Sequence, residues 1–159
     1  MKLKGLTDED FLQYQKPSMF IICPYCTFKC DKENGTQICQ NWSLPKSEII
    51  EIDTEIIIKR YLQNNITKAI VFGGLEPLDS FEEVIDFIEL LRNKYKCLDD
   101  VIIYTGYRND EIEDKISLLS QYKNIIIKFG RYIPGQKPHF DPVLGIDLIS
   151  NNQYRVKIS

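Results

Sequence analysis

The chain lacks any long apolar run, and it carries no excess of positive charge. None of its apolar segments approaches the roughly eighteen residues that a membrane-spanning helix needs, and the start Met1-Lys2-Leu3-Lys4 does not fit a signal peptide. Lysine and arginine total 20 against 23 aspartate and glutamate residues, which gives a net charge of −3. The sequence therefore predicts a cytoplasmic protein with no membrane partner and no nucleic-acid partner, because a nucleic-acid groove needs a basic surface.

Histidine is almost absent, and internal repeats and linkers are missing. The one histidine, His139, lies beside Pro138 in a predicted loop, where we expect a surface residue and not a catalytic one. Nothing divides the 159 residues, so we expect a single domain spanning 1–159. A domain of this size buries roughly two thirds of its unfolded surface, so its core does not need a metal merely to fold.

Cysteine, by contrast, is concentrated in one short segment. Four of the five cysteines, Cys23, Cys26, Cys30 and Cys39, follow directly after the apolar run 19–22. In a reducing compartment such thiols are metal ligands or catalytic groups more often than disulfides, and an odd number fits a disulfide framework poorly. Thiolates are soft ligands, so the segment alone leaves open a four-thiolate zinc site and an iron–sulfur cluster. The fifth, Cys97, follows a predicted helix and is expected to pack.

Predicted strands and amphipathic helices alternate along the chain. The apolar patterns predict strands over 19–22, 68–72, 101–104 and 124–128, and a short extended piece over 48–52. They predict one helix that begins at Asp53 or Thr54, one that begins with a capping box at Ser80–Glu83, and one over 110–120. Segments 146–149 and 154–158 resemble a hairpin around an Asn-rich turn. This order predicts an α/β fold with a mainly parallel sheet and a C-terminal β-hairpin.

Unusual residues follow each of the four predicted parallel strands. Ligands bind at the carboxyl ends of such strands, so these segments are expected to line one rim. They are the cysteine segment, Gly73-Gly-Leu-Glu-Pro77, Thr105-Gly-Tyr107 and Phe129-Gly-Arg131.

Taken together, these segments resemble the radical S-adenosylmethionine superfamily, and in particular the activating proteins of anaerobic (class III) ribonucleotide reductase. The resemblance covers about 19–131 and leaves 132–159 as a C-terminal extension. Two features depart from the common pattern and indicate a divergent branch. Eight residues separate Cys30 from Cys39 where the superfamily has two, and Leu75 widens the usual Gly-Gly-Glu-Pro motif.

The resemblance implies a fold, two cofactors and a set of binding residues. The fold would be an incomplete (β/α) barrel. Three thiolates would hold a [4Fe-4S] cluster and leave one iron open to chelation by S-adenosylmethionine, and no side chain is assigned as catalytic. The implied ligands of the metal are Cys26, Cys30 and Cys39, and the implied contacts of S-adenosylmethionine are Phe28, Gly73, Gly74, Glu76 and Thr105. Cys23 is then expected to be a small buried residue at the end of its strand.

The resemblance also implies a function. It predicts a radical enzyme that generates a glycyl radical on a glycyl radical enzyme, most simply an anaerobic ribonucleotide reductase, with a small electron-donor protein as a second partner. One alternative is a radical enzyme that acts on another peptide or on a small molecule. Another is a zinc or iron–sulfur binding module without turnover.

Overall fold

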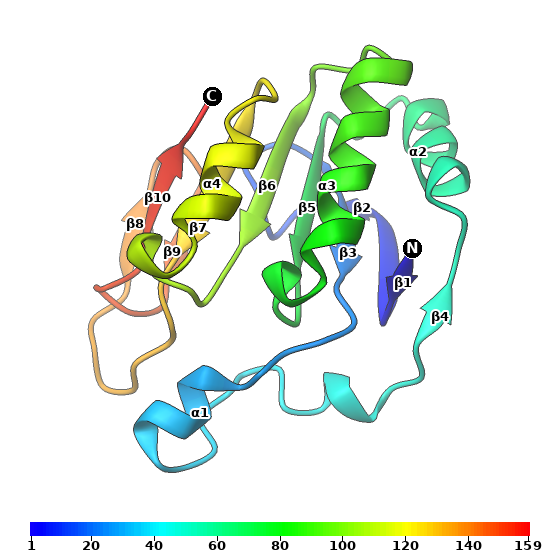
Figure 1. The fold of residues 1–159 in the computed structure, drawn as a ribbon. Coiled ribbons are helices and arrows are strands. Elements are labelled where there is room, and N and C mark those ends of the chain that lie inside the picture. The colour runs from blue at the N-terminus through cyan, green and yellow to red at the C-terminus, as the bar shows by residue number, and fades with distance from the viewer.

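The fold is built on a six-stranded sheet, and the computed structural model describes all residues from 1 to 159 (Figure 1). The four central strands run parallel to one another, and the two edge strands pair antiparallel with their neighbours. In spatial order the strands are β10 (Tyr154–Lys157), β7 (Ile125–Phe129), β6 (Asp100–Tyr104), β5 (Ala69–Gly73), β3 (Ser18–Ile22) and β2 (Gly5–Asp10). The predicted α/β class with a mainly parallel sheet is confirmed. The sheet is open at β2 and β10, as an incomplete barrel requires.

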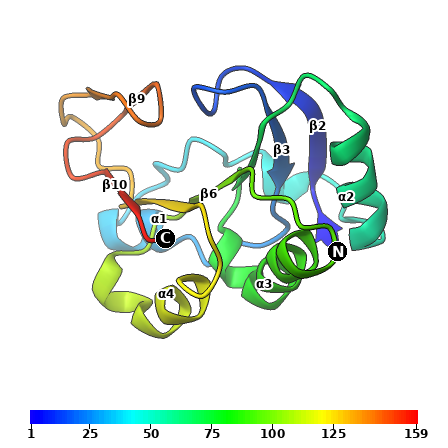
Figure 2. The same ribbon diagram turned by 90° about the horizontal axis from the view of Figure 1, so that it is seen from above.

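Three helices cover one face of this sheet: α2 (Thr54–Gln63), α3 (Phe81–Glu89) and α4 (Glu113–Leu119) (Figure 2). Alternate side chains of each strand point to the same face, so every second residue of the central strands packs against these helices. The Phe72 ring of β5, for example, meets the Phe87 ring of α3 edge-on, with 5.3 Å between the ring centroids. The main core therefore lies between the sheet and the helices.

One of the two predicted helix caps is present. The Asp53 side chain accepts a hydrogen bond of 2.8 Å from the backbone N–H of Glu55 and so caps α2. The predicted capping box at Ser80 is wrong, because a 3₁₀ turn over Pro77–Ser80 runs directly into α3. The Ser80 hydroxyl donates instead to the Pro77 carbonyl, at 3.3 Å. The far end of α3 continues as a π-helical turn, Leu90–Lys94.

The opposite face of the sheet carries a smaller core beneath a hairpin. The hairpin strands β8 (His139–Asp141) and β9 (Ile146–Leu148) pair antiparallel. Leu144 and Leu148 from this region are buried with Val71 and Ile102 of the sheet. Figure 2 shows β9 on the side of the sheet away from α3 and α4.

The C-terminal antiparallel pairing is present, but its partners differ from the predicted ones. We expected 146–149 to pair with 154–158, whereas β9 pairs with β8, and β10 adds to the main sheet beside β7. A strand edge left at β7 would expose unpaired backbone groups, and β10 satisfies them.

Two strands near the N-terminus were not predicted. β1 (Lys2–Leu3) pairs with β4 (Ile50–Glu51), which lies within the predicted extended piece. β2 has the sequence Gly-Leu-Thr-Asp-Glu-Asp, and none of its side chains is fully buried. Such a charged strand has no apolar alternation to reveal it, and its charge suits the edge of a sheet.

The cysteine segment crosses the carboxyl ends of the parallel strands. Its short helix α1 (Lys29–Asn34) lies beyond those ends in Figure 1. Neither α1 nor the following 3₁₀ turn, Leu44–Lys46, contains a buried residue. Specific polar contacts rather than packing must therefore hold this segment against the sheet.

A further 3₁₀ turn, Asn109–Glu111, precedes α4. No helix in the structure has the length and apolar character that crossing a bilayer requires.

Candidate functional site

A cavity of about 500 Å³ lies at the carboxyl ends of the parallel strands. All four strand-end segments contribute to its wall, as the sequence predicted. Their contributions are Cys26, Cys30 and Cys39 after β3, Gly74, Leu75 and Glu76 after β5, Thr105, Gly106 and Tyr107 after β6, and Gly130 and Arg131 after β7.

Three of the thiols share this cavity. Cys26, Cys30 and Cys39 all line it and all are partly exposed. Burial raises the pKa of Cys26 to about 12, and it also raises the pKa of Cys30, with a further contribution from the nearby Cys39. As these side chains are placed, no three of them are close enough to form a ready-made metal site.

Cys23 stands apart from these three thiols. Its side chain has no exposed surface and belongs to the main core. Burial raises its pKa far above the ordinary value, so the neutral thiol is strongly favoured. The expectation of a small buried residue at the strand end is confirmed.

The donor set fits an iron–sulfur cluster. Three soft thiols face one cavity, and a metal centre there would offset the cost of ionising them. The backbone N–H of Phe28 donates to the Cys26 sulfur at 3.3 Å, a type of contact that tunes iron–sulfur centres. Phe28 adopts a left-handed conformation with φ 53°, which is uncommon for a bulky residue. Phe28 is not among the residues that line the cavity, so its predicted contact with adenine remains a prediction.

Gly73 and Gly74, at the end of β5, are close to side chains of β3. Gly74 has φ +77°, and a Cβ atom there would lie 2.6 Å from the Cγ2 atom of Ile22. A Cβ atom on Gly73 would lie 3.0 Å from the Phe20 ring. Gly74 reaches the cavity wall, whereas Gly73 is the buried last residue of β5. Position 74 therefore requires glycine, whereas a side chain on Gly73 would fit only if the Phe20 ring shifted slightly.

Glu76 is a buried carboxylate held between two strand ends. Its side chain accepts hydrogen bonds from the backbone N–H of Leu78 (3.1 Å), the hydroxyl of Thr105 (2.7 Å) and the backbone N–H of Gly106 (2.8 Å). Glu76 is only 8% exposed, and burial raises its pKa to about 7 despite these three donors. A carboxylate offers about four acceptor positions, so one remains for a ligand.

The Thr105 hydroxyl is occupied by protein partners on both sides. It donates to Glu76, and it accepts a hydrogen bond of 3.0 Å from the backbone N–H of Tyr107. Thr105 lines the cavity, but its hydroxyl orients Glu76 in this structure. The predicted contact of Thr105 with S-adenosylmethionine remains a prediction.

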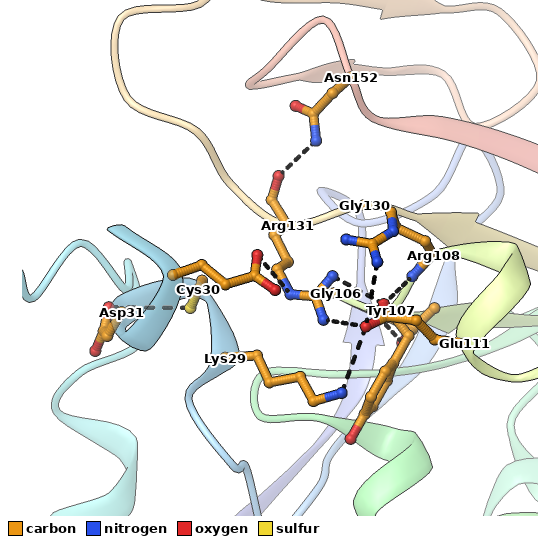
Figure 3. Close-up of polar contacts among 12 residues, drawn as sticks. Lys29, Cys30, Asp31, Gly106, Tyr107, Arg108, Glu111, Gly130, Arg131 and Asn152 are labelled. Atoms are coloured by element: carbon orange, nitrogen blue, oxygen red, sulfur yellow. Dashed lines mark hydrogen bonds and ion pairs between the residues drawn. The ribbon is translucent and has the colours of Figure 1, made fainter. Parts of the chain in front are cut away.

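A group of four charged residues, which we call the clasp, joins the cysteine segment to the rim (Figure 3). It consists of Lys29 and Glu33 from α1, Glu111 and Arg131. The Arg131 guanidinium binds both Glu111 carboxylate oxygens, at 2.7 and 2.8 Å. Its Nε atom lies 3.3 Å from Glu33, and the Lys29 amine lies 3.4 Å from Glu111. Because the Arg131 side chain is only 6% exposed, the clasp supplies the cysteine segment with a buried anchor that packing does not provide.

Asp79 forms a second anchor for the same segment. Its carboxylate accepts a hydrogen bond of 2.7 Å from the backbone N–H of Thr27 and one of 2.6 Å from the Tyr107 hydroxyl. The Lys29 amine lies 4.5 Å from the centre of the Tyr107 ring, within cation–π range. Glu111 and Asp79 were not predicted as site residues.

Glu111→Gln should weaken the clasp and destabilise the protein. The substitution removes the charge that Arg131 binds, and hydrogen bonds between charged groups contribute roughly 1.5–3 kcal/mol. The neighbouring Asp110 is a matched control, because its side chain is 71% exposed and pairs only with Arg108. Asp110→Asn should change the free energy of unfolding by less than about 0.5 kcal/mol. Urea denaturation measures both, and equal effects of the two substitutions would rule out the clasp as an anchor.

The stabilisation by Glu111 should also fade in acid. Hydrogen bonds from Arg131 lower the pKa of Glu111 from its ordinary 4.5 to about 2. The contribution is therefore fully present above pH 4.5 and is lost as the pH falls through the lower value. The difference in unfolding free energy between wild type and Glu111→Gln should be smaller at about pH 3 than at neutral pH. A difference that stays constant over this range would contradict the assignment.

The fold and the cavity define an α/β protein with a thiol-lined site for an iron–sulfur centre. A family model described as a 4Fe-4S single cluster domain matches residues 18–143, which include the cysteine segment and all four parallel strands. The match covers most of the chain, so the chain belongs to this family, and its expected metal centre is a 4Fe-4S cluster. Comparisons with curated proteins and with solved structures found no match.

Proposed function

We propose that the protein is a radical S-adenosylmethionine enzyme that generates a glycyl radical on a partner enzyme. One observation carries the proposal: the three thiols share a single cavity with the Gly74–Glu76 turn and with Thr105. A cluster domain that only transfers electrons has no need of a second binding site beside its thiols. In a radical enzyme, S-adenosylmethionine would occupy that site.

The residues of the cavity have separate tasks in this proposal. Cys26, Cys30 and Cys39 hold the cluster and leave one iron without a protein ligand. The remaining acceptor position of Glu76 binds the ammonium group of S-adenosylmethionine, and Gly74 allows the backbone to come close to it. When bound, the cluster and S-adenosylmethionine supply one-electron chemistry that yields a carbon radical able to abstract hydrogen. The protein contributes placement of the two groups and exclusion of water.

The four-thiolate zinc alternative requires Cys23 as its fourth ligand. Cys23 would have to leave the main core and ionise, and its burial opposes both steps. The family match to a 4Fe-4S domain also favours iron over zinc.

The proposed partner is an anaerobic ribonucleotide reductase, with a small electron-donor protein as the source of the electron. Support for this partner comes from the resemblance of the four strand-end motifs to the activating proteins of that enzyme.

The experiment is anaerobic reconstitution followed by addition of S-adenosylmethionine. The reconstituted protein should be brown and carry about four iron and four sulfide per chain. The electron paramagnetic resonance signal of the reduced cluster should change on addition of S-adenosylmethionine, and 5′-deoxyadenosine should form. With the reductase present, a glycyl radical signal should appear. A full cluster whose spectrum does not respond to S-adenosylmethionine would overturn the proposal and favour an electron-transfer module.

A further inference from the structure

Lys128 lines the cavity near the carboxyl end of β7. Along β7, Ile125, Ile127 and Phe129 pack in the main core, whereas Ile126 belongs to the smaller core on the opposite face. The alternation of a strand puts Lys128 on the same face as Ile126. Lys128 and its cross-strand neighbour Tyr104 both line the cavity.

The Lys128 amine has no carboxylate partner. It forms no ion pair, and its one hydrogen bond runs to the Gly130 carbonyl at 3.3 Å. Glu76 is the one acidic group that favours its charged form, but Glu76 already accepts three hydrogen bonds. The amine is therefore a positive charge without a counterion.

No neighbouring acidic group forms an ion pair with Lys128, and this includes Asp147, which lines the same cavity. Arg155 of β10 lies directly opposite Lys128 and is paired with Asp141 at 3.3 Å. The same Asp141 oxygen also accepts backbone hydrogen bonds from Val143 and Leu144. Asp141 is thus already engaged by Arg155 and by its own turn.

The other cations at the cavity are neutralised by the clasp. Both Lys29 and Arg131 line the cavity, and both are paired with Glu111. Lys128 is the cavity-lining cation that is left without an ion pair. Lys128 is half-buried, so its ammonium group loses part of its hydration, and a ligand with an opposite charge would offset that cost. Burial lowers the pKa of Lys128 to about 8, so the amine is still mainly charged at neutral pH.

We infer that Lys128 binds a carboxylate of the substrate. The wall of the same cavity includes Phe20, Ile146 and Leu148, which suit a short apolar body attached to that carboxylate. A single uncompensated positive charge matches a monoanion better than a phosphate dianion. This inference rests on the proposed function in one respect, which is that S-adenosylmethionine occupies the cysteine end of the cavity. A small acid and an acidic group of a protein loop both present this carboxylate.

The test compares two probes that have the same shape and differ in charge. Butyrate and butyramide are titrated into the full-length protein with its oxidised cluster, and binding is followed by the amide chemical shifts of Tyr104 and Gln153. Wild type should bind butyrate about tenfold more tightly than butyramide, the scale of one charge-assisted hydrogen bond. Lys128→Met should remove this preference and keep the apolar stem. Lys123→Met, which changes an exposed lysine, should retain it.

Two further probes identify the source of the carboxylate and its charge. Tighter binding of a capped aspartyl dipeptide than of butyrate would support a protein loop, and the reverse would support a small acid. Equal binding of butyrate and butyramide to wild type would overturn the inference, and so would tighter binding of inorganic phosphate than of butyrate.

The affinity for S-adenosylmethionine separates this inference from the proposed function. Lys128→Met should leave that affinity within about twofold, because the amine is assigned to the substrate. A tenfold loss would assign Lys128 to the carboxylate of the cofactor itself and overturn the inference. If wild type binds no S-adenosylmethionine, the proposed function fails, and the butyrate titration still decides whether Lys128 binds a carboxylate.

Discussion

Alanine at Cys26, Cys30 or Cys39 should abolish cluster binding, whereas alanine at Cys23 or Cys97 should leave the cluster in place. The first three thiols line the cavity, and a cluster held by three thiolates has no spare protein ligand. We expect each of these variants to lose essentially all iron and sulfide after anaerobic reconstitution. Iron and sulfide analysis and the visible absorption of the cluster measure the loss.

The two control substitutions, at Cys23 and Cys97, differ in how far the thiol lies from the cavity. Cys23 is close in sequence to the three proposed ligands, but its side chain lies in the main core. Cys23→Ala therefore tests whether a nearby thiol that does not face the cavity is needed for the cluster. Cys97 precedes β6 and thus lies at the end of the sheet opposite the cavity, where its carbonyl accepts a hydrogen bond from Arg92 at 2.8 Å. Both controls should lose only about 1 kcal/mol of stability, the usual scale of a point substitution. A Cys23→Ala variant that loses its cluster as completely as Cys30→Ala would make a four-thiolate site the better description.

The parallel strands could be predicted because their apolar character is local. Runs such as Ile70–Phe72 and Val101–Ile103 are buried on both faces of the sheet, so they are continuous in sequence and end where glycine or a polar residue begins. The carboxyl ends of neighbouring parallel strands lie at the same edge of the sheet. This rule correctly predicted that the cysteine segment and the Gly74–Glu76 turn line the same cavity. The rule needs no knowledge of individual side-chain contacts.

The clasp could not be predicted, because it depends on tertiary structure alone. Glu111 lies at the start of a weakly amphipathic segment, where an acidic residue is ordinarily a solvated charge. Arg131 is twenty residues further along the chain, and only the packing of β7 beside β6 brings the two together. The position of Cys39, the third proposed cluster ligand, also could not be predicted from the sequence. The structure places Cys39 on the cavity wall, but the spacing alone could not say whether eight residues would bring it back to Cys30.

The predicted cofactor contacts differ in how far the sequence determines the local backbone that positions them. Gly74 and Glu76 reach the cavity because the turn after β5 must pass Ile22 closely. Phe28, the N-cap residue of α1, is not among the residues that line the cavity; it adopts a left-handed conformation, and its N–H donates to the Cys26 sulfur. A prediction from position between two ligands could not anticipate that conformation.

Glu76→Gln should weaken the binding of S-adenosylmethionine by roughly ten- to a hundredfold and leave the cluster intact. The carboxylate has one acceptor position left after its bonds to Leu78, Thr105 and Gly106, and a charge-assisted hydrogen bond to an ammonium group contributes ~1.5–3 kcal/mol. Glutamine keeps the size of the side chain and removes the charge. Equilibrium binding to the reconstituted protein measures the affinity, and iron analysis checks the cluster.

Thr105→Val is the matched control for this substitution. It removes one of the three donors to Glu76 but keeps the carboxylate charge, so the affinity for S-adenosylmethionine should fall less than in Glu76→Gln. A structural role alone would make the two losses of affinity equal, since both variants disturb the same hydrogen-bonded contact between the segments after β5 and β6. Equal losses of affinity in the two variants would therefore show that Glu76 only supports the turn. A loss confined to Glu76→Gln, with full iron content and unchanged unfolding, would assign the ammonium group of the cofactor to the free position on this carboxylate.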